Sequence, residues 1–369
     1  MAEISLRERN MKIGILTVYS ADYGSFFQGA ALCKAIRDLG YNCEIINDSL
    51  RSEHSLPFAV GHFAAYHFPD CINHLIAKKS DLFGKYLVLR DEIAKEVNLV
   101  SKPYKSYSQV EAAYDCIVIG SDELWSFTNP KIKYTPAYFG VGSEIPHISY
   151  ATSASTLNTD APAKILAEVK KSLCQFFALA VRDERTREWV EALTQREVTM
   201  TIDPVLLNPF FLTDRPAGKA GYVLVYGEHY SSDSVQAITA YAKERSLPIK
   251  SVSWRHPWAD EHLKGLSCVD FQEIFHQSRF CFVSTFHGTI FSILHERPFI
   301  SVITEERGRK VRDLLELLHL PHRLYEAGKA IEDHEPIDYA VVMERIDNLR
   351  ASSMAYLKNA LETMEEGNP

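Results

Sequence analysis

The sequence predicts an α/β protein with two Rossmann-like domains and a cleft between them. The chain has 369 residues, which is too long for one ordinary hydrophobic core and favours about two domains. In both halves, short apolar runs typical of buried parallel strands alternate with helical patterns. Several of these runs end in polar clusters, as expected where the carboxyl ends of parallel strands form a binding surface.

The first domain is expected at residues 12–207, behind a flexible leader at residues 1–11. It opens with a βαβ unit whose helix runs from about residue 26 to 39. Residues 52 to about 105 have a helical, aromatic-rich composition, so we interpret them as a helical insertion. Asp203-Pro204 is expected to end the last strand at the domain junction. The strands are predicted at residues 12–19, 42–47, 114–119, 147–151, 177–182 and 198–202.

The second domain is expected at residues 221–335, after a linker at residues 208–220 that contains two prolines and a glycine. A C-terminal helix is predicted at residues 336–369 because this stretch has a mixed amphipathic pattern. The strands of the second domain are predicted at residues 221–227, 249–253, 280–283 and 297–303.

The composition argues against several classes of protein. Hydrophobic residues make up 46% and charged residues 24%, as in a typical soluble globular protein. The formal net charge of -8 disfavours a general role in binding nucleic acid. The loop after the first strand lacks the GxGxxG fingerprint, so a nicotinamide or flavin cofactor is disfavoured. The histidines of the insertion lack a ligand-type spacing, so no metal site is expected.

The cysteine pattern and hydropathy bear on location. The number of cysteines is odd and none forms a CxxC pair, which favours reduced thiols in the cytoplasm. No apolar run reaches the ~18 residues of a membrane span, and the N-terminal residues lack a signal-peptide pattern. A cytoplasmic protein is expected, and a peripheral position at the inner membrane face is left open. The cysteines are Cys33, Cys43, Cys71, Cys116, Cys174, Cys268 and Cys281.

The most informative stretch is residues 280–294, where an apolar strand turns into a helix. Ser284 and Thr285 can each cap that helix, and the helical pattern carries an apolar face. His287 lies at the turn. A helix that starts at a strand end favours anions through its free backbone N–H groups, so we expect a phosphate-bearing or carboxylate-bearing substrate here.

A series of short motifs runs through the chain in a characteristic order. In this order they resemble the landmarks of the polysaccharide pyruvyl transferase family, in its Ser-Phe-His-Gly-Thr-x-Phe-Ser branch. Each motif is weak alone, whereas the series is specific and covers most of the chain, from Lys12 to about Leu320. The motifs are Asp22-Tyr23-Gly24 with Gln28, Gly120-Ser121-Asp122-Glu123-Leu124-Trp125, Ser149-Tyr150-Ala151-Thr152-Ser153, Val181-Arg182-Asp183, Ile202-Asp203-Pro204-Val205-Leu206-Leu207 and Ser284-Thr285-Phe286-His287-Gly288-Thr289-Ile290-Phe291-Ser292.

The resemblance implies a two-domain fold of the glycosyltransferase-B type. It also implies transfer of the pyruvyl unit of phosphoenolpyruvate onto two sugar hydroxyls as a cyclic ketal. Phosphoenolpyruvate is then a co-substrate, and no metal or other cofactor is expected. The expected partners are phosphoenolpyruvate and a saccharide, free or lipid-linked, with no nucleic acid; homo-oligomer formation is left open. The matched motifs place Asp22, Tyr23 and Gly24 among the substrate-binding residues.

The ketal reaction needs a group that can donate and accept protons, and it needs cations and N–H groups that bind the donor's phosphate and carboxylate. His287 is the leading acid or base, although its ring could instead only brace the turn. Gly288 and Thr289 are candidates to offer backbone N–H groups to the phosphate, or these groups could simply cap the helix. Together with Ser284 and Thr285 they form the predicted donor side of the site.

Arginines are the expected partners of the donor's carboxylate and phosphate. Arg182 is the first candidate, because a planar guanidinium binds such groups bidentately; the alternative is an ion pair with Asp183 or Glu184. Many family members also carry an arginine two residues before the histidine, where this sequence has Thr285. The candidates to replace that cation are Arg255, Arg307 and Arg309.

Acceptor binding is expected from the motif around residue 121. Ser121 and Asp122 could orient the sugar, although Asp122 could equally cap a helix. Trp125, Trp254 and Trp258 could stack on sugar rings or lie in the core.

Two further functions stay open in the sequence. One is a glycosyltransferase of the same architecture with a nucleotide-sugar donor, which would use the same helix N-terminus for a diphosphate. The other is a non-catalytic family member that binds a glycan or an anion only. The non-catalytic alternative is motivated by Thr285 and by two carboxylates, Asp22 and Glu123, that stand where the family has amides. A carboxylate beside an anionic donor is unfavourable unless a cation lies close.

Overall fold

The structure is a computed structural model. The predicted leader and helical insertion lie almost wholly outside the residues that it describes, as does most of the predicted linker. It describes residues 10–19, 22–47, 99–104, 106–127, 132, 134–154, 161–212, 221–303, 308–326, 331 and 336–367.

A parallel sheet of four strands, ordered β2-β1-β3-β4, forms the centre of the first domain. Its inner strands are short apolar runs, and every residue of β3 is buried. A parallel pair of strands, β5 and β6, continues from β4 through isolated bridges. The strands are β1 (Lys12–Leu16), β2 (Asn42–Ile45), β3 (Cys116–Ile119), β4 (His147–Ser149), β5 (Ala180–Val181) and β6 (Thr199–Met200).

Four helices in the described part of the first domain begin at side chains that accept backbone hydrogen bonds. Asp22 caps α1, Ser106 caps α4, Asp183 caps α6 and Asp203 caps α7. Because Asp22 is the cap, α1 starts three residues earlier than the expected start at Phe26. The helices are α1 (Tyr23–Asp38), α4 (Tyr107–Glu111), α5 (Ala163–Leu173), α6 (Glu184–Thr194) and α7 (Pro204–Leu207), with a 3-10 helix at Pro136–Phe139.

The last two strands of the first domain are shorter than the sequence predicts. The stretches 177–182 and 198–202 contain strands of two residues each, β5 and β6. Asp203 then starts a short helix, so it does not merely end a strand.

The second domain is built on a parallel sheet of five strands, ordered β11-β10-β7-β8-β9. Its edge strand β9 is not predicted from the sequence, because it is short and only partly buried. The strands are β7 (Val223–Tyr226), β8 (Ile249–Val252), β9 (Glu261–Leu263), β10 (Phe280–Val283) and β11 (Phe299–Ser301). The helices are α8 (Ser232–Glu244), α9 (Cys268–His276), α10 (Phe286–Leu294) and α11 (Arg309–Leu317), with a 3-10 helix at Pro321–Arg323.

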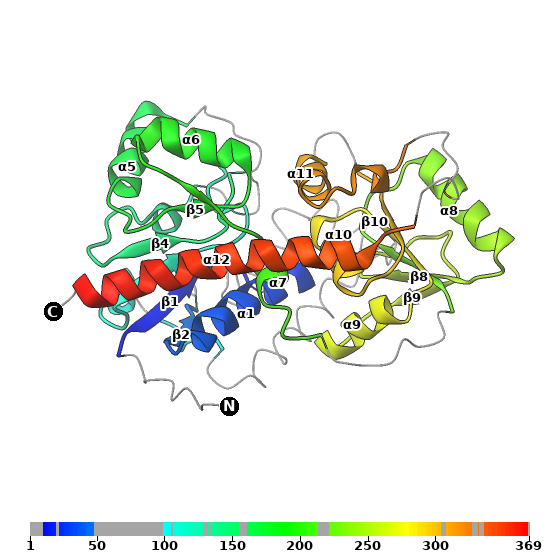
Figure 1. Ribbon diagram of the computed structural model, residues 1–369, viewed down its shortest axis with the longest axis horizontal. Coiled ribbons are helices and arrows are strands. Elements are labelled where there is room, and N and C mark those ends of the chain that lie inside the picture. Colours follow the sequence, from blue (N-terminus) through cyan, green and yellow to red (C-terminus); the bar gives the residue numbers. More distant parts are fainter. Residues whose placement is uncertain are drawn as a thin grey trace.

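A long helix, α12 (Tyr339–Gly367), runs across both domains (Figure 1). Near its start, the Arg345 guanidinium donates a hydrogen bond to the Leu318 carbonyl of the second domain, at 3.2 Å. Further along, the Tyr356 hydroxyl donates to the Ser149 carbonyl at the end of β4, at 2.9 Å. The helix therefore ties the two sheets together from one side.

The largest hydrophobic cluster also joins the two domains, because it contains buried residues of both sheets and of α12. Within it, the Tyr23 ring of α1 stacks on the Phe271 ring of α9 with centroids 4.0 Å apart. No helix in the described part of the chain is both long enough and apolar enough to cross a membrane.

Candidate active site

A cavity of about 220 Å³ lies where the two domains meet. Three helices, α1, α10 and α11, present their N-terminal turns to it. This arrangement favours an anion, because the N-terminus of a helix carries a partial positive charge and unpaired N–H groups. The lining residues are Asp22, Ser25 and Asp122 of the first domain, and Tyr226, Glu228, His229, Trp254, Ser284, Thr285, Phe286, His287, Val302, Ile303, Lys310 and Val311 of the second.

The turn at residues 284–289 has the predicted strand-to-helix geometry. Thr285 is the N-cap of α10, and its hydroxyl oxygen accepts a hydrogen bond from the Gly288 N–H at 3.0 Å. The Thr289 N–H donates to the Thr285 carbonyl at 3.1 Å. The N–H groups of Gly288 and Thr289 are therefore used within the helix, and those of Phe286 and His287 are left facing the start of the helix.

Gly24 is the neighbour that fixes the His287 ring. A Cβ atom at position 24 would lie 2.5 Å from Cγ of the ring, which is closer than real side chains approach. Gly24 belongs to α1 and His287 to α10, so this contact crosses the domain boundary. The motif glycine thus lets the histidine enter the space between the two helices.

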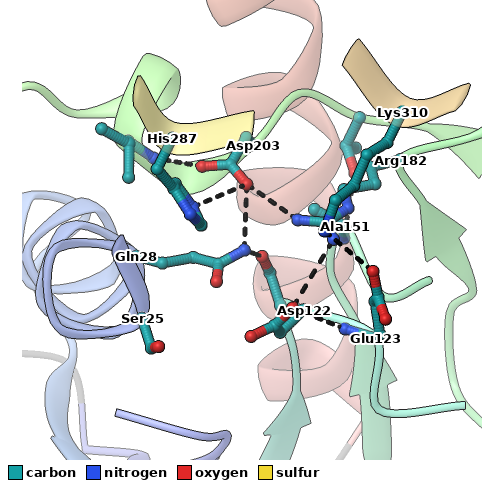
Figure 2. A network of polar contacts seen from close by, with 12 residues as sticks. Ser25, Gln28, Asp122, Glu123, Ala151, Arg182, Asp203, His287 and Lys310 are labelled. Carbon is teal, nitrogen blue, oxygen red and sulfur yellow. Dashed lines mark hydrogen bonds and ion pairs between the residues drawn. The ribbon is translucent and has the colours of Figure 1, made fainter. Parts of the chain in front are cut away.

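Asp203 is the centre of a buried polar network that holds the ring from the other side (Figure 2). Its Oδ2 accepts hydrogen bonds from Gln28 Nε2 at 2.9 Å and from Arg182 Nη1 at 3.0 Å. The same oxygen lies 3.7 Å from His287 Nε2, a distance that suits an ion pair with a protonated ring. Burial by itself raises the pKa of Asp203, but His287 and Arg182 outweigh it, so the pKa lies below its ordinary value.

Arg182 is buried in this network and does not line the cavity. Its side chain is 5% exposed, and it pairs with Asp203 and, at 3.6 Å, with Asp122. It therefore does not take the predicted alternative of pairing with Asp183 or Glu184. Burial lowers its pKa, but the facing carboxylates, Asp203 first, raise it above the ordinary value, so the group is charged. The guanidinium also lies 5.0 Å from the centre of the Phe286 ring.

Asp122 and Glu123 place two carboxylates at the end of β3. Asp122 is not the cap of a helix; its Oδ1 accepts a hydrogen bond from the Glu123 N–H at 2.8 Å. Asp122 also has a φ of 93°, a conformation that is uncommon for a residue with a side chain. Glu123 pairs with Lys310 of α11, Oε1 to Nζ, at 2.8 Å. A carboxylate beside an anionic donor is unfavourable unless a cation lies close, and Lys310 is a cation close to Glu123.

Other predicted residues lie around the cavity or away from it. The Tyr23 hydroxyl donates to the Leu266 carbonyl at 2.6 Å, so Tyr23 joins the domains without reaching the cavity. Ser121 is wholly buried, and its hydroxyl accepts a hydrogen bond from Gln28 Nε2. Arg255 and Arg309 are exposed and do not line the cavity, and Arg307 lies outside the described residues.

The tryptophans divide between core and cavity. Trp125 is wholly buried and its indole N–H donates to the Tyr138 carbonyl, which makes it a core residue. Trp258 packs against Tyr230, outside the cavity lining. Trp254 lines the cavity and is the tryptophan that a sugar ring could reach.

Gln28, Asp203 and Lys310 are among the residues of the site that were not predicted as functional candidates. Gln28 and Asp203 occur in the motifs, but their side chains meet only through the packing of α1 on α7, which sequence spacing does not reveal. Lys310 had a weaker signal as one charge in a basic stretch. Among the described residues, no group of histidine, cysteine, aspartate or glutamate side chains is arranged to hold a metal ion.

Comparisons with known proteins decide the family. The model of the polysaccharide pyruvyl transferase family matches residues 22–306, most of the chain. The chain belongs to this family. It is therefore a transferase, and the family implies a saccharide acceptor. No curated protein matches the sequence.

Solved structures show the fold. A Listeria monocytogenes structure assigned as a UDP-N-acetylglucosamine 2-epimerase has a TM-score of 0.50 at 10% identity, covering 95% of this chain and 91% of that one. The UDP-GlcNAc 2-epimerase of Neisseria meningitidis, bound to UDP-GlcNAc, has a TM-score of 0.49 at 9% identity, covering 95% and 94%. The likeness to the Listeria structure, together with the two parallel sheets, shows that the fold of this polysaccharide pyruvyl transferase family member is of the Rossmann-like glycosyltransferase-B type, as expected.

Proposed function

We propose that this family member transfers the pyruvyl group of phosphoenolpyruvate to two hydroxyls of a saccharide as a ketal and releases phosphate. The observation that carries the proposal is the position of His287. Its ring lies at the start of α10, lines the cavity and has the carboxylate of Asp203 behind it. This combination gives one acid-base group beside an anion-favouring helix end.

The proposed reaction begins with the donor's methylene carbon. A protonated His287 gives its proton to this carbon, and a sugar hydroxyl adds to the neighbouring carbon. The second hydroxyl then adds there as the C–O bond to phosphate breaks, so that one hydroxyl proton balances the new methyl group and the other leaves with phosphate. Asp203 supports the first step, because a carboxylate 3.7 Å from Nε2 stabilises the charged ring.

The acceptor saccharide has a matching wall in the same cavity. Trp254 supplies an apolar face for a sugar ring, and Asp122 and Glu228 supply hydroxyl acceptors. These side chains come from both domains, so an acceptor would lie across the domain boundary beside His287.

The test is release of phosphate from phosphoenolpyruvate in the presence of a panel of saccharides, free and lipid-linked. Wild-type protein is expected to release phosphate only with a suitable acceptor, and His287→Gln is expected to lose about a hundredfold or more in rate. A matched control is His229→Gln, which changes another histidine of the cavity wall, one that pairs with Glu228 at 3.4 Å.

Two results would contradict the proposal. Unchanged turnover by His287→Gln would remove the acid-base assignment. Transfer from a UDP-sugar, with no phosphate released from phosphoenolpyruvate by any acceptor in the panel, would assign the protein to the nucleotide-sugar transferases instead.

A further inference from the structure

Lys310 is the one lysine or arginine that lines the cavity, among the residues that the structure describes. It lies in the first turn of α11, and its amine is 5.6 Å from the centre of the Phe286 ring. Phe286 directly follows Thr285, the N-cap of α10. The amine therefore stands beside the helix start where an anion would bind.

The two cations near the cavity differ in availability. Arg182 is 5% exposed and is shared between Asp203 and Asp122, so its charge is already engaged on two sides. The Lys310 side chain is 35% exposed and, among the residues that the structure describes, has one carboxylate partner within ion-pair distance, Glu123. A partly exposed ion pair is weak, whereas a phosphate brings two negative charges and several acceptor oxygens. Lys310 is thus the cation that can change partners.

We propose that Lys310 binds the phosphate or carboxylate of the donor and that Glu123 holds its amine until the donor arrives. This inference rests on the proposed function for the identity of the donor. Before binding, the Glu123 carboxylate neutralises the amine across the domain boundary. On binding, the amine leaves Glu123 for the donor anion, beside the N–H groups of Phe286 and His287. The exchange gives the site a cation although position 285 carries a threonine.

The Glu123 carboxylate competes with the donor anion for the Lys310 amine and so weakens donor binding. A neutral amide of the same shape would not compete in this way. Removing the charge of Glu123 and removing the charge of Lys310 should therefore change anion affinity in opposite directions. A purely structural ion pair would give the same direction for both changes.

The experiment measures binding of inorganic phosphate and of phosphoenolpyruvate by calorimetry, with thermal unfolding as a check of folding. Lys310→Met is expected to weaken both affinities by about tenfold or more, and Lys310→Arg to retain most of them. Glu123→Gln is expected to strengthen both by about threefold. Arg312→Met is the control, since it removes an exposed charge from the same helix.

Four outcomes would overturn the inference. They are wild-type affinity in Lys310→Met, equal losses in Arg312→Met, weaker binding in Glu123→Gln, and no binding of either anion by the wild-type protein at millimolar concentrations. The transfer assay separates the two proposals. If the Lys310 variants turn over as fast as the wild type, only the role of Lys310 is refuted. If phosphate binding depends on Lys310 but no turnover occurs, only the proposed function is refuted.

Discussion

At the scale of single residues, the site depends on the close approach of the His287 ring to Gly24, which has no side chain. Gly24 and His287 belong to different domains, and the ring occupies the space that a Cβ at position 24 would take. On its other side lies Asp203, whose side chain is 2% exposed. The ring is thus held between a backbone and a buried carboxylate, which leaves it little freedom to turn.

Replacing Gly24 with alanine should therefore impair catalysis. The new methyl group would push the ring away from Asp203, and a displacement of about 1 Å in a catalytic group can cost about a hundredfold in rate. The measurement is kcat for phosphate release, together with the melting temperature. Gly29→Ala is the control in the same helix, because its Cβ would meet the flexible end of Ile45 at 3.1 Å and would lie at ordinary contact distance, 3.4 Å, from Thr17 and Tyr19.

A loss of rate in Gly24→Ala without a comparable loss in Gly29→Ala is the expected pattern. Alanine itself favours a helix over glycine by about 1 kcal/mol, so lower helix stability would not explain the effect. Equal activity of the two variants would show that the position of the ring is not critical.

At the scale of elements, strand ends and helix starts form the site, and most of these were visible in the sequence. The apolar runs of β1, β3, β7 and β10 and the cap at Thr285 follow from local patterns, and the structure confirms them. Strands β5 and β6 were less predictable, since their short pairing is set by the neighbouring β4. The ion pair of Glu123 with Lys310 joins residues far apart in the chain, so no local pattern could reveal it.

The end of α10 carries a buried histidine that should make stability depend on pH. His295 caps the helix, and its Nε2 lies 2.5 Å from Gln272 Oε1 of α9. Burial, the nearby His276 and Arg297 lower its pKa to about 3, against about 6.5 in an unfolded chain. Between these values the unfolded chain binds the extra proton. Stability is therefore full above about pH 6.5 and falls as the pH decreases, by up to about 1.4 kcal/mol per pH unit.

Urea unfolding at a series of pH values between 7 and 5, roughly the window in which histidines but few carboxylates titrate, measures this effect. His295→Gln should flatten the decline, because the side chain that must stay neutral in the fold is gone. His229→Gln, which changes a histidine whose side chain is 50% exposed, should leave the slope as in the wild type. The same slope in all three proteins would refute the assignment.

At the scale of the whole molecule, α12 connects the second domain to the polar network of the first. Its buried Leu357, Leu361 and Met364 belong to the cluster that joins the domains. Burial of each such side chain contributes about 1.5–3 kcal/mol to the free energy of unfolding. The sum over the three is a large fraction of the free energy of unfolding of a typical domain. Ser353, in the same helix, accepts a hydrogen bond at its hydroxyl from the Ile202 N–H, at 3.1 Å. Ile202 directly precedes Asp203.

Ser353→Ala should therefore affect stability and the site together. Ile202 and Ser353 are 5% and 1% exposed, so the change leaves a buried N–H without an acceptor, at a cost of about 1–3 kcal/mol. The backbone that carries Asp203 is then less firmly held, and kcat for phosphate release should fall with the lost alignment of His287. Urea unfolding and the transfer assay measure the two effects in the same preparation.

Ser352→Ala is the matched control, because its exposed hydroxyl only donates to the Leu349 carbonyl one turn earlier, and both measurements should stay near the wild-type values. A stability loss with an unchanged rate would show that α12 supports the fold without positioning the acid-base pair.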